Sequence, residues 1–306
     1  MSANFKALQL PIIRRLKHFL KNHAAYVLPN FDYSQVSWGE ARASLENLRS
    51  KRSLQFVADR QLFTRRLRPK SLNDQLMLLD FLAHHPKLSP TSKHFAYIAA
   101  CHKSMELLDY SLCENLYQQL DERIEAALHF PHHRSNIRRS GTHILSSTVV
   151  VQLHLELFLG KESFVASVET GATHWTPIIV RNKSRTLFKT SSNVARVLGM
   201  AALVSSIRED WTEAAKHVHE LHEVFRQALH AAYVDKVAED LFLQDVQILG
   251  LARRASEGKL SPRERTTLLH SCLRRENPEK VAIMTNNFFQ IVNYNVPSCR
   301  SFISNQ

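Results

Sequence analysis

Residues 97–120 read YIAACHKSMELLDYSLCENLYQQL, and residues 198–221 read LGMAALVSSIREDWTEAAKHVHEL. Each stretch contains a pair of small residues and, nine positions later, an acidic–aromatic pair: Ala100-Cys101 and Asp109-Tyr110 in the first, Ala201-Ala202 and Asp210-Trp211 in the second. The same pattern therefore occurs twice in the chain.

The two stretches resemble the tetratricopeptide family of helical repeats. In that family, small residues lie where two antiparallel helices cross, and a short acidic–aromatic turn joins the helices. The resemblance implies helical hairpins that turn near Asp109 and near Asp210. The match extends to the packing positions of the second helix, which are Cys113, Tyr117 and Leu120 in one stretch and Ala214, Val218 and Leu221 in the other. The turns lie 101 residues apart, close to three units of about 34 residues. The family's crossing glycine and closing proline are absent from both stretches. The resemblance implies a mainly α, TPR-like superhelix of stacked antiparallel hairpins that holds a partner in a concave groove.

Less regular hairpins are expected around the two predicted units, with turns at 160–163 and at 277–279. We expect an N-terminal helical region at 1–90, a helical-repeat-like domain at 91–294 and a loose tail at 295–306. Residues 151–157 alternate apolar and polar side chains, yet Leu, Gln and Glu favour a helix for 148–159. Residues 176–189 favour a small β-hairpin or an extended insertion. Ser191 is expected to cap the helix that follows.

Glycine is scarce, with seven in 306 residues and none closer than eight positions to another. That distribution excludes the Gly-rich phosphate loops of dinucleotide-binding and P-loop proteins, and it excludes the nucleophile elbow of hydrolases. No motif selects a catalytic residue from the many Ser, His and acidic side chains. The sequence therefore favours a protein without enzymatic activity and without a cofactor.

The net charge is +12, which favours an acidic protein or another polyanion as partner. Two long stretches contain no acidic residue, one between Glu125 and Glu156 and one between Glu169 and Glu209. We expect basic side chains in these stretches to form one anion-binding face: Arg134, Arg138, Arg139, Arg181, Lys183 and Arg185. Two alternatives remain open, an enzyme on a helical scaffold that acts on an anionic small molecule, and RNA or DNA binding through charge.

A histidine-rich segment, KHVHELHE at 216–223, raises the question of a metal site. On a helix, His219, His222 and Glu223 lie close enough to supply three ligands to zinc or iron. The segment lacks the H-E-x-x-H spacing, and the chain contains no E-x-x-H pair. We therefore expect no metal here and expect His217, Glu220 and Glu223 on a solvated helix face.

Residues 5–28 predict a basic amphipathic helix, either packed on the core or in peripheral contact with an anionic membrane surface. The longest apolar runs are too short for a transmembrane segment. The four cysteines form no C-x-x-C pair and favour reduced thiols. These features favour a cytoplasmic location, with a membrane surface or the mitochondrion as alternatives. The three tryptophans, Trp38, Trp175 and Trp211, are expected to anchor the core.

Overall fold

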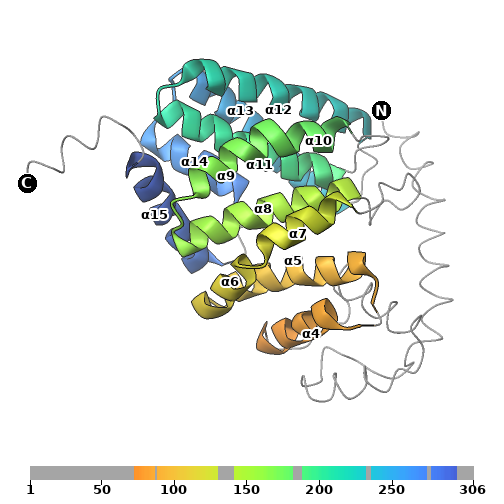
Figure 1. Ribbon diagram of the computed structural model, residues 1–306. Helices are drawn as coiled ribbons and strands as arrows, with labels where there is room; N and C mark the ends of the chain where they lie inside the picture. Colours follow the sequence, from red (N-terminus) through yellow and green to blue (C-terminus); the bar gives the residue numbers. More distant parts are fainter. Residues whose placement is uncertain are drawn as a thin grey trace, which may run out of the picture. The chain divides into compact units, whose positions relative to one another are not determined.

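The computed structural model describes residues 72–86, 88–129, 141–181, 188–231, 236–273 and 277–294. Every regular element within these ranges is a helix, which confirms the expected mainly α fold (Figure 1). The chain forms two compact units, Met1–Lys103 and Ser104–Gln306. The first contains α4 (Leu72–His84) and most of α5 (Pro90–Glu106). Most of the expected N-terminal helical region, including the amphipathic segment 5–28, lies outside the described residues.

The second unit is a succession of helices from α6 to α15. Their bounds are α6 Tyr110–Tyr117, α7 Leu120–Leu128, α8 Gly141–Leu159, α9 Phe164–Thr170, the π-helical η1 Gly171–Trp175, α10 Thr176–Arg181, α11 Phe188–Ile207, α12 Trp211–Ala231, α13 Lys236–Ser256, α14 Pro262–Cys272 and α15 Pro278–Tyr294. The predicted helix at 148–159 is confirmed as the C-terminal part of α8. Ser261 caps α14, since Ser261 and Glu264 form a reciprocal capping box.

Four turns share one hydrogen-bonding pattern. Each has one residue with positive φ followed by a residue whose N–H donates to the carbonyl five positions earlier. The positive-φ residues are Leu108, Gly160, Glu209 and Gly258. The closing N···O distances are 3.0 Å for Asp109–Ser104, 2.8 Å for Lys161–Glu156, 2.9 Å for Asp210–Ser205 and 2.9 Å for Lys259–Arg254. This is the Schellman arrangement, which ends a helix by satisfying its last carbonyls.

The two predicted aspartate turns are confirmed in detail. Asp109 accepts a hydrogen bond from the N–H of Leu112 at 2.9 Å, and Asp210 accepts one from the N–H of Glu213 at 3.0 Å. Each aspartate therefore ends one helix with its backbone and begins the next with its side chain. The aromatic residue that follows lies over a later helix end: Tyr110 stacks on Phe158, with ring centroids 4.6 Å apart, and Trp211 lies against Gly258.

The spacing of these turns differs from the expected 34-residue unit. The turn at Gly160 lies midway between those at Leu108 and Glu209, and Gly258 follows at a similar interval, so successive turns are separated by about 50 residues. The 101 residues between the predicted turns thus correspond to two intervals and not to three. The units are longer because α8, α11 and α12 have 19, 20 and 21 residues.

Two helices, α8 and α11, form the core of the second unit (Figure 1). Helix α11 packs against α8, α12, α13 and α14, and α8 also packs against α6, α7, α9 and α15. All described residues of α11 from Thr190 to Val204 are buried. By length and composition α8 could span a bilayer, but 78% of that stretch is buried, as in the core helix of a soluble protein.

The segment 176–189 is not extended where it is described. Residues 176–181 form α10 and residues 188–189 begin α11, so the expected β-hairpin or extended insertion is wrong for these residues; 182–187 lie outside the described ranges. Pro177 is tolerated because it lies in the first turn of α10. The preceding turn widens into the π-helix η1, and the Thr176 hydroxyl donates to the carbonyl of Gly171 at 2.9 Å.

Two further expectations need correction. Ser191 does not cap α11, because the helix begins three residues earlier at Phe188 and Ser191 is buried within it. Trp211 is 40% exposed and Trp175 is half-buried, so neither is a core anchor. Trp38 lies outside the described residues.

The left-handed residue at Glu209 provides a test of the turn geometry. A non-glycine residue there is strained, whereas Gly258 occupies the equivalent position without strain. We expect Glu209→Gly to raise the free energy of unfolding by about 0.5–1 kcal/mol and Gly258→Ala to lower it by about 1 kcal/mol. Urea denaturation followed by circular dichroism measures both. Equal destabilisation by the two substitutions would contradict the shared turn.

Candidate functional site

Most of the predicted anion-binding residues lie outside the described residues. Arg134, Arg138 and Arg139 fall in the segment 130–140, and Lys183 and Arg185 fall in 182–187. Arg181 is the last residue of α10, and its side chain is not described. The described structure does define the helix ends to which these segments are joined, which are Leu128 and Gly141 for the first and Arg181 and Phe188 for the second.

Helices α8 and α11 run parallel with their N-terminal ends side by side. The amide of Asn193, six residues into α11, donates to the hydroxyls of Ser146 and Ser147, six and seven residues into α8. The N···O distances are 3.2 and 3.0 Å. Since 130–140 leads into Gly141 and 182–187 leads into Phe188, both acid-free segments join the unit at this one end. The four Schellman turns lie at the C-terminal ends of their helices, opposite this end in α8 and α11.

From its third residue onward, α11 contains four consecutive buried polar residues: Thr190, Ser191, Ser192 and Asn193. Ser192 donates to the carboxylate of Asp245 on α13 at 2.9 Å. The hydroxyls of Thr190 and Ser191 are buried and have no hydrogen-bond partner. Sequence reasoning assigned Ser191 to a helix cap and so missed these four residues as an interior polar group.

Asp245 is 3% exposed, and burial raises the pKa of its carboxyl to about 7, although the hydrogen bond from Ser192 and the positive charge of Arg196 oppose the rise. Arg196 is itself buried and donates to the side chain of Gln244 at 3.3 Å, and Gln244 in turn donates to the carbonyl of Ser271 at 2.6 Å. A chain of polar contacts thus joins α11, α13 and α14 beneath the polar run.

A second interior carboxylate lies in α8. Glu156 is 0% exposed, and one of its carboxylate oxygens accepts hydrogen bonds from Tyr117 at 3.1 Å, Ser167 at 2.8 Å and Gln152 at 3.3 Å. Its other oxygen is buried without a partner. Burial raises the pKa of this carboxyl against those hydrogen bonds. These contacts bind α6 and α9 to α8, which is a structural role.

Both carboxylates could have been suspected from the sequence. Once 148–159 is taken as a helix, the apolar residues of LHLEL surround Glu156 on every side of the helix. Asp245 gives a weaker signal, because α13 is amphipathic and Val246 beside it is exposed. Their hydrogen-bond partners come from other helices and could not be read from local sequence.

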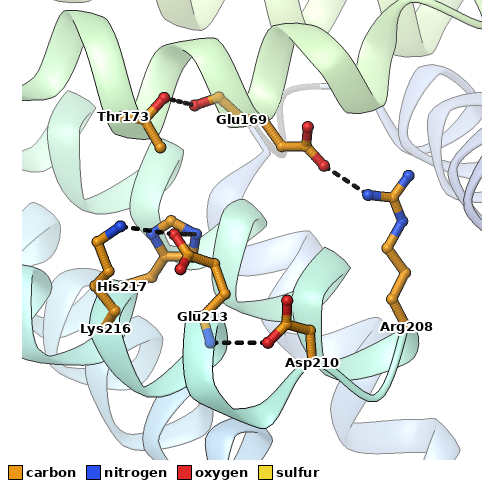
Figure 2. Close-up of polar contacts among 7 residues, drawn as sticks. All are labelled: Glu169, Thr173, Arg208, Asp210, Glu213, Lys216 and His217. Atoms are coloured by element: carbon orange, nitrogen blue, oxygen red, sulfur yellow. Dashed lines mark hydrogen bonds and ion pairs between the residues drawn. The ribbon is translucent and has the colours of Figure 1, made fainter.

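The histidine-rich segment, residues 216–223, lies in the middle of α12. Figure 2 shows two of its residues, Lys216 and His217. His217 is 2% exposed, and burial lowers the pKa of its imidazole, partly offset by Glu213, whose carboxylate lies 3.8 Å from Nε2. The expected solvated position of His217 is therefore wrong, whereas His219 and His222 are exposed. Above this turn, Arg208 pairs with Glu169 of α9 at 2.5 Å, and Glu213 pairs with Lys216 at 2.9 Å.

The three side chains considered as metal ligands differ in exposure. His219 and His222 are exposed, and Glu223 is half-buried. Among the described residues, no group of three or more His, Cys, Asp or Glu side chains is arranged to hold a metal ion.

No protein-family model, curated protein or solved structure matches the chain. The site is therefore described from its own residues alone.

Asp245 predicts a pH-dependent effect on stability. Because its folded pKa is raised above the unfolded value of about 3.8, the folded state binds more protons between these pH values, and stability falls as pH rises toward 7. Asp245→Asn removes this dependence and keeps an oxygen that can accept from Ser192. The variant should therefore gain about 2 kcal/mol relative to the native protein between pH 5 and pH 8. Chemical denaturation at both pH values measures this difference, and a pH-independent difference would contradict it.

The metal question has a direct test. We expect protein purified without a histidine tag to carry no stoichiometric zinc or iron by elemental analysis, because the histidines of α12 do not converge. Near-stoichiometric metal that is lost in His219→Ala/His222→Ala would contradict this expectation and favour an enzyme.

Proposed function

We propose that the chain is a non-enzymatic helical scaffold that holds an acidic protein, or another anionic partner, at the end where its hairpins are linked. The observation that carries the proposal is the parallel packing of α8 and α11, bridged by Asn193 to Ser146 and Ser147. It gives the two acid-free segments, 130–140 and 182–187, a common point of attachment. The resemblance to tetratricopeptide repeats is consistent with a scaffold of this kind.

The distribution of charge along the sequence also favours an anionic partner that binds the basic segments. The described residues contain 17 Lys or Arg and 22 Asp or Glu, so the helices themselves are net acidic. Residues 1–71 contain 14 Lys or Arg and 4 Asp or Glu, and 130–140 and 182–187 contain five basic residues and no acidic one. An anionic partner would be repelled by most of the helical surface and attracted to these basic segments.

The N-terminal ends of α8 and α11 also favour anion binding, through their backbone N–H groups and not through their side chains. Backbone N–H groups in the first turn of a helix are free to bind anions, and the macrodipole places partial positive charge there. Neither α8 nor α11 has an acidic residue in its first turn. Two parallel N-terminal ends beside acid-free segments therefore favour an anion over a cation.

Charge reversal tests the proposal. We expect Arg138→Glu/Arg139→Glu/Arg185→Glu in the full chain to weaken binding of fluorescent poly-glutamate at least tenfold, because three attractive charges become repulsive. Fluorescence anisotropy across a range of salt concentrations measures the affinity, which should fall steeply with salt in the native protein. A matched control reverses three exposed basic residues at the α13–α14 turn: Arg253, Lys259 and Arg263.

The control variant has the same net charge and should bind nearly as well as the native protein. Equal losses in the two triple variants would mean that net charge alone attracts the probe and would contradict the proposed face. Single-stranded RNA serves as a second probe. Tighter binding of RNA than of poly-glutamate at matched salt would favour the nucleic-acid alternative instead.

A further inference from the structure

We infer that the first turn of α11 is a binding site for a phosphate group, in which the hydroxyls of Thr190 and Ser191 act beside the paired N-terminal ends of α8 and α11. The inference rests on the proposed function and deepens it, because it names the chemistry of the anion. It uses described residues only and does not depend on the basic segments.

The hydroxyls of Thr190 and Ser191 are buried without a hydrogen-bond partner. Thr190 is 1% exposed and Ser191 is 2% exposed, and neither hydroxyl has a hydrogen-bond partner. Buried polar groups in folded proteins are nearly always hydrogen-bonded, so two consecutive unpartnered hydroxyls call for an explanation. The next two residues show the ordinary situation, since Ser192 bonds to Asp245 and Asn193 bonds to Ser147. The two hydroxyls without a hydrogen-bond partner therefore lie in the turn nearest the N-terminal end of α11.

The side chains in the first turn of α11 have a defined direction. Every Cα–Cβ bond of a helix tilts toward its N-terminus, so side chains in the first turn project toward the free N–H groups. All residues from Thr190 to Val204 are buried against neighbouring helices. The Thr190 and Ser191 side chains therefore project toward the N-terminal end of α11, which Asn193 joins to α8.

The electrostatic potential at the N-terminal ends of α8 and α11 favours an anion. Helices α8 and α11 have 19 and 20 residues, long enough for a developed macrodipole, and neither has an acidic residue in its first turn. Arg196, 5% exposed, adds a buried positive charge along the same helix. The carboxyl of Asp245 reaches Ser192, but burial raises its pKa to about 7, which reduces its negative charge at neutral pH.

The number of hydrogen-bond donors at this turn favours a phosphate group over a carboxylate. The turn offers two adjacent hydroxyl donors together with backbone N–H groups, more donors than the two oxygens of a carboxylate readily accept from one side. A phosphate group presents three or four oxygens in a tetrahedral arrangement and can accept from several converging donors at once. The donor set therefore fits a phosphate group better than the side chain of Asp or Glu.

The test uses the full chain and inorganic phosphate at constant ionic strength. We expect sodium phosphate, but not sodium chloride, to raise the melting temperature of the native protein in a saturable manner, because a ligand bound to the folded state stabilises it. Thr190→Val and Ser191→Ala remove the donors with little change of shape. Each should weaken the apparent phosphate affinity about tenfold, the effect expected for loss of a hydrogen bond to a charged group.

The variants also control for folding. Because each replaces an unpartnered buried hydroxyl, Thr190→Val should melt no lower than the native protein without phosphate. Ser206→Ala removes a buried hydroxyl at the C-terminal end of the same helix, where it donates to Leu203, and should leave phosphate affinity unchanged. Unchanged affinity in both Thr190→Val and Ser191→Ala would overturn the inference, as would the absence of any phosphate effect on the native protein.

A second arm identifies where the phosphate resides. A peptide carrying phosphoserine is compared with the same peptide carrying serine: preference for the phosphopeptide over free phosphate, lost in Thr190→Val, assigns the phosphate to a protein partner. Equal affinity for both phosphate probes, also lost in Thr190→Val, assigns the site to free phosphate compounds. The proposed function is tested separately by poly-glutamate binding to Arg138→Glu/Arg139→Glu/Arg185→Glu, a variant that leaves Thr190 and Ser191 unchanged. Failure of the site and failure of the scaffold proposal are therefore distinguishable.

Discussion

The contact between α8 and α11 is the interaction on which the second unit depends. Asn193 fixes the two helices parallel and in register at their N-terminal ends. Helix α11 then supports α12, α13 and α14, and α8 supports α6, α7, α9 and α15. At the C-terminal end of α8, the amide of Asn287 from α15 donates to the carbonyls of Leu157 and Phe158 at 2.7 and 3.2 Å. One end of this helix pair is therefore closed by protein, while the other carries unpartnered hydroxyls and the attachment points of basic segments.

The turns at Asp109 and Asp210 were predicted from the resemblance to helical repeats, and the structure confirms both positions. Each turn is a local feature, because the aspartate caps the next helix through residues within one turn. The period could not be obtained in the same way. The residues at positive φ are Leu108 and Glu209 in two turns and Gly160 and Gly258 in the others, so no single residue type marks the repeat.

The sequence predicted the positive charge of the candidate site but not the helices that form it. Acid-free stretches are visible in sequence, but the parallel pairing that brings their ends together depends on Asn193 meeting Ser146 and Ser147, 47 and 46 residues away. Burial was likewise a tertiary property: polar KHVHELHE suggested a solvated helix, yet His217 faces the interior. The prediction for 176–189 was wrong for 176–181 because Pro177 lies in the first turn of α10, directly after the π-helical turn η1, where proline does not end a helix.

The central claim is that an anion binds where the N-terminal ends of α8 and α11 meet. Amide hydrogen–deuterium exchange of the full chain, with and without a saturating anionic ligand, tests it most directly, using poly-glutamate and inorganic phosphate in turn. The account predicts slower exchange in the first turns of α8 and α11, near Gly141 and Thr190, with no change at the turns around Glu209 and Gly258. Protection confined to those turns, or to residues 1–71 alone, would contradict it.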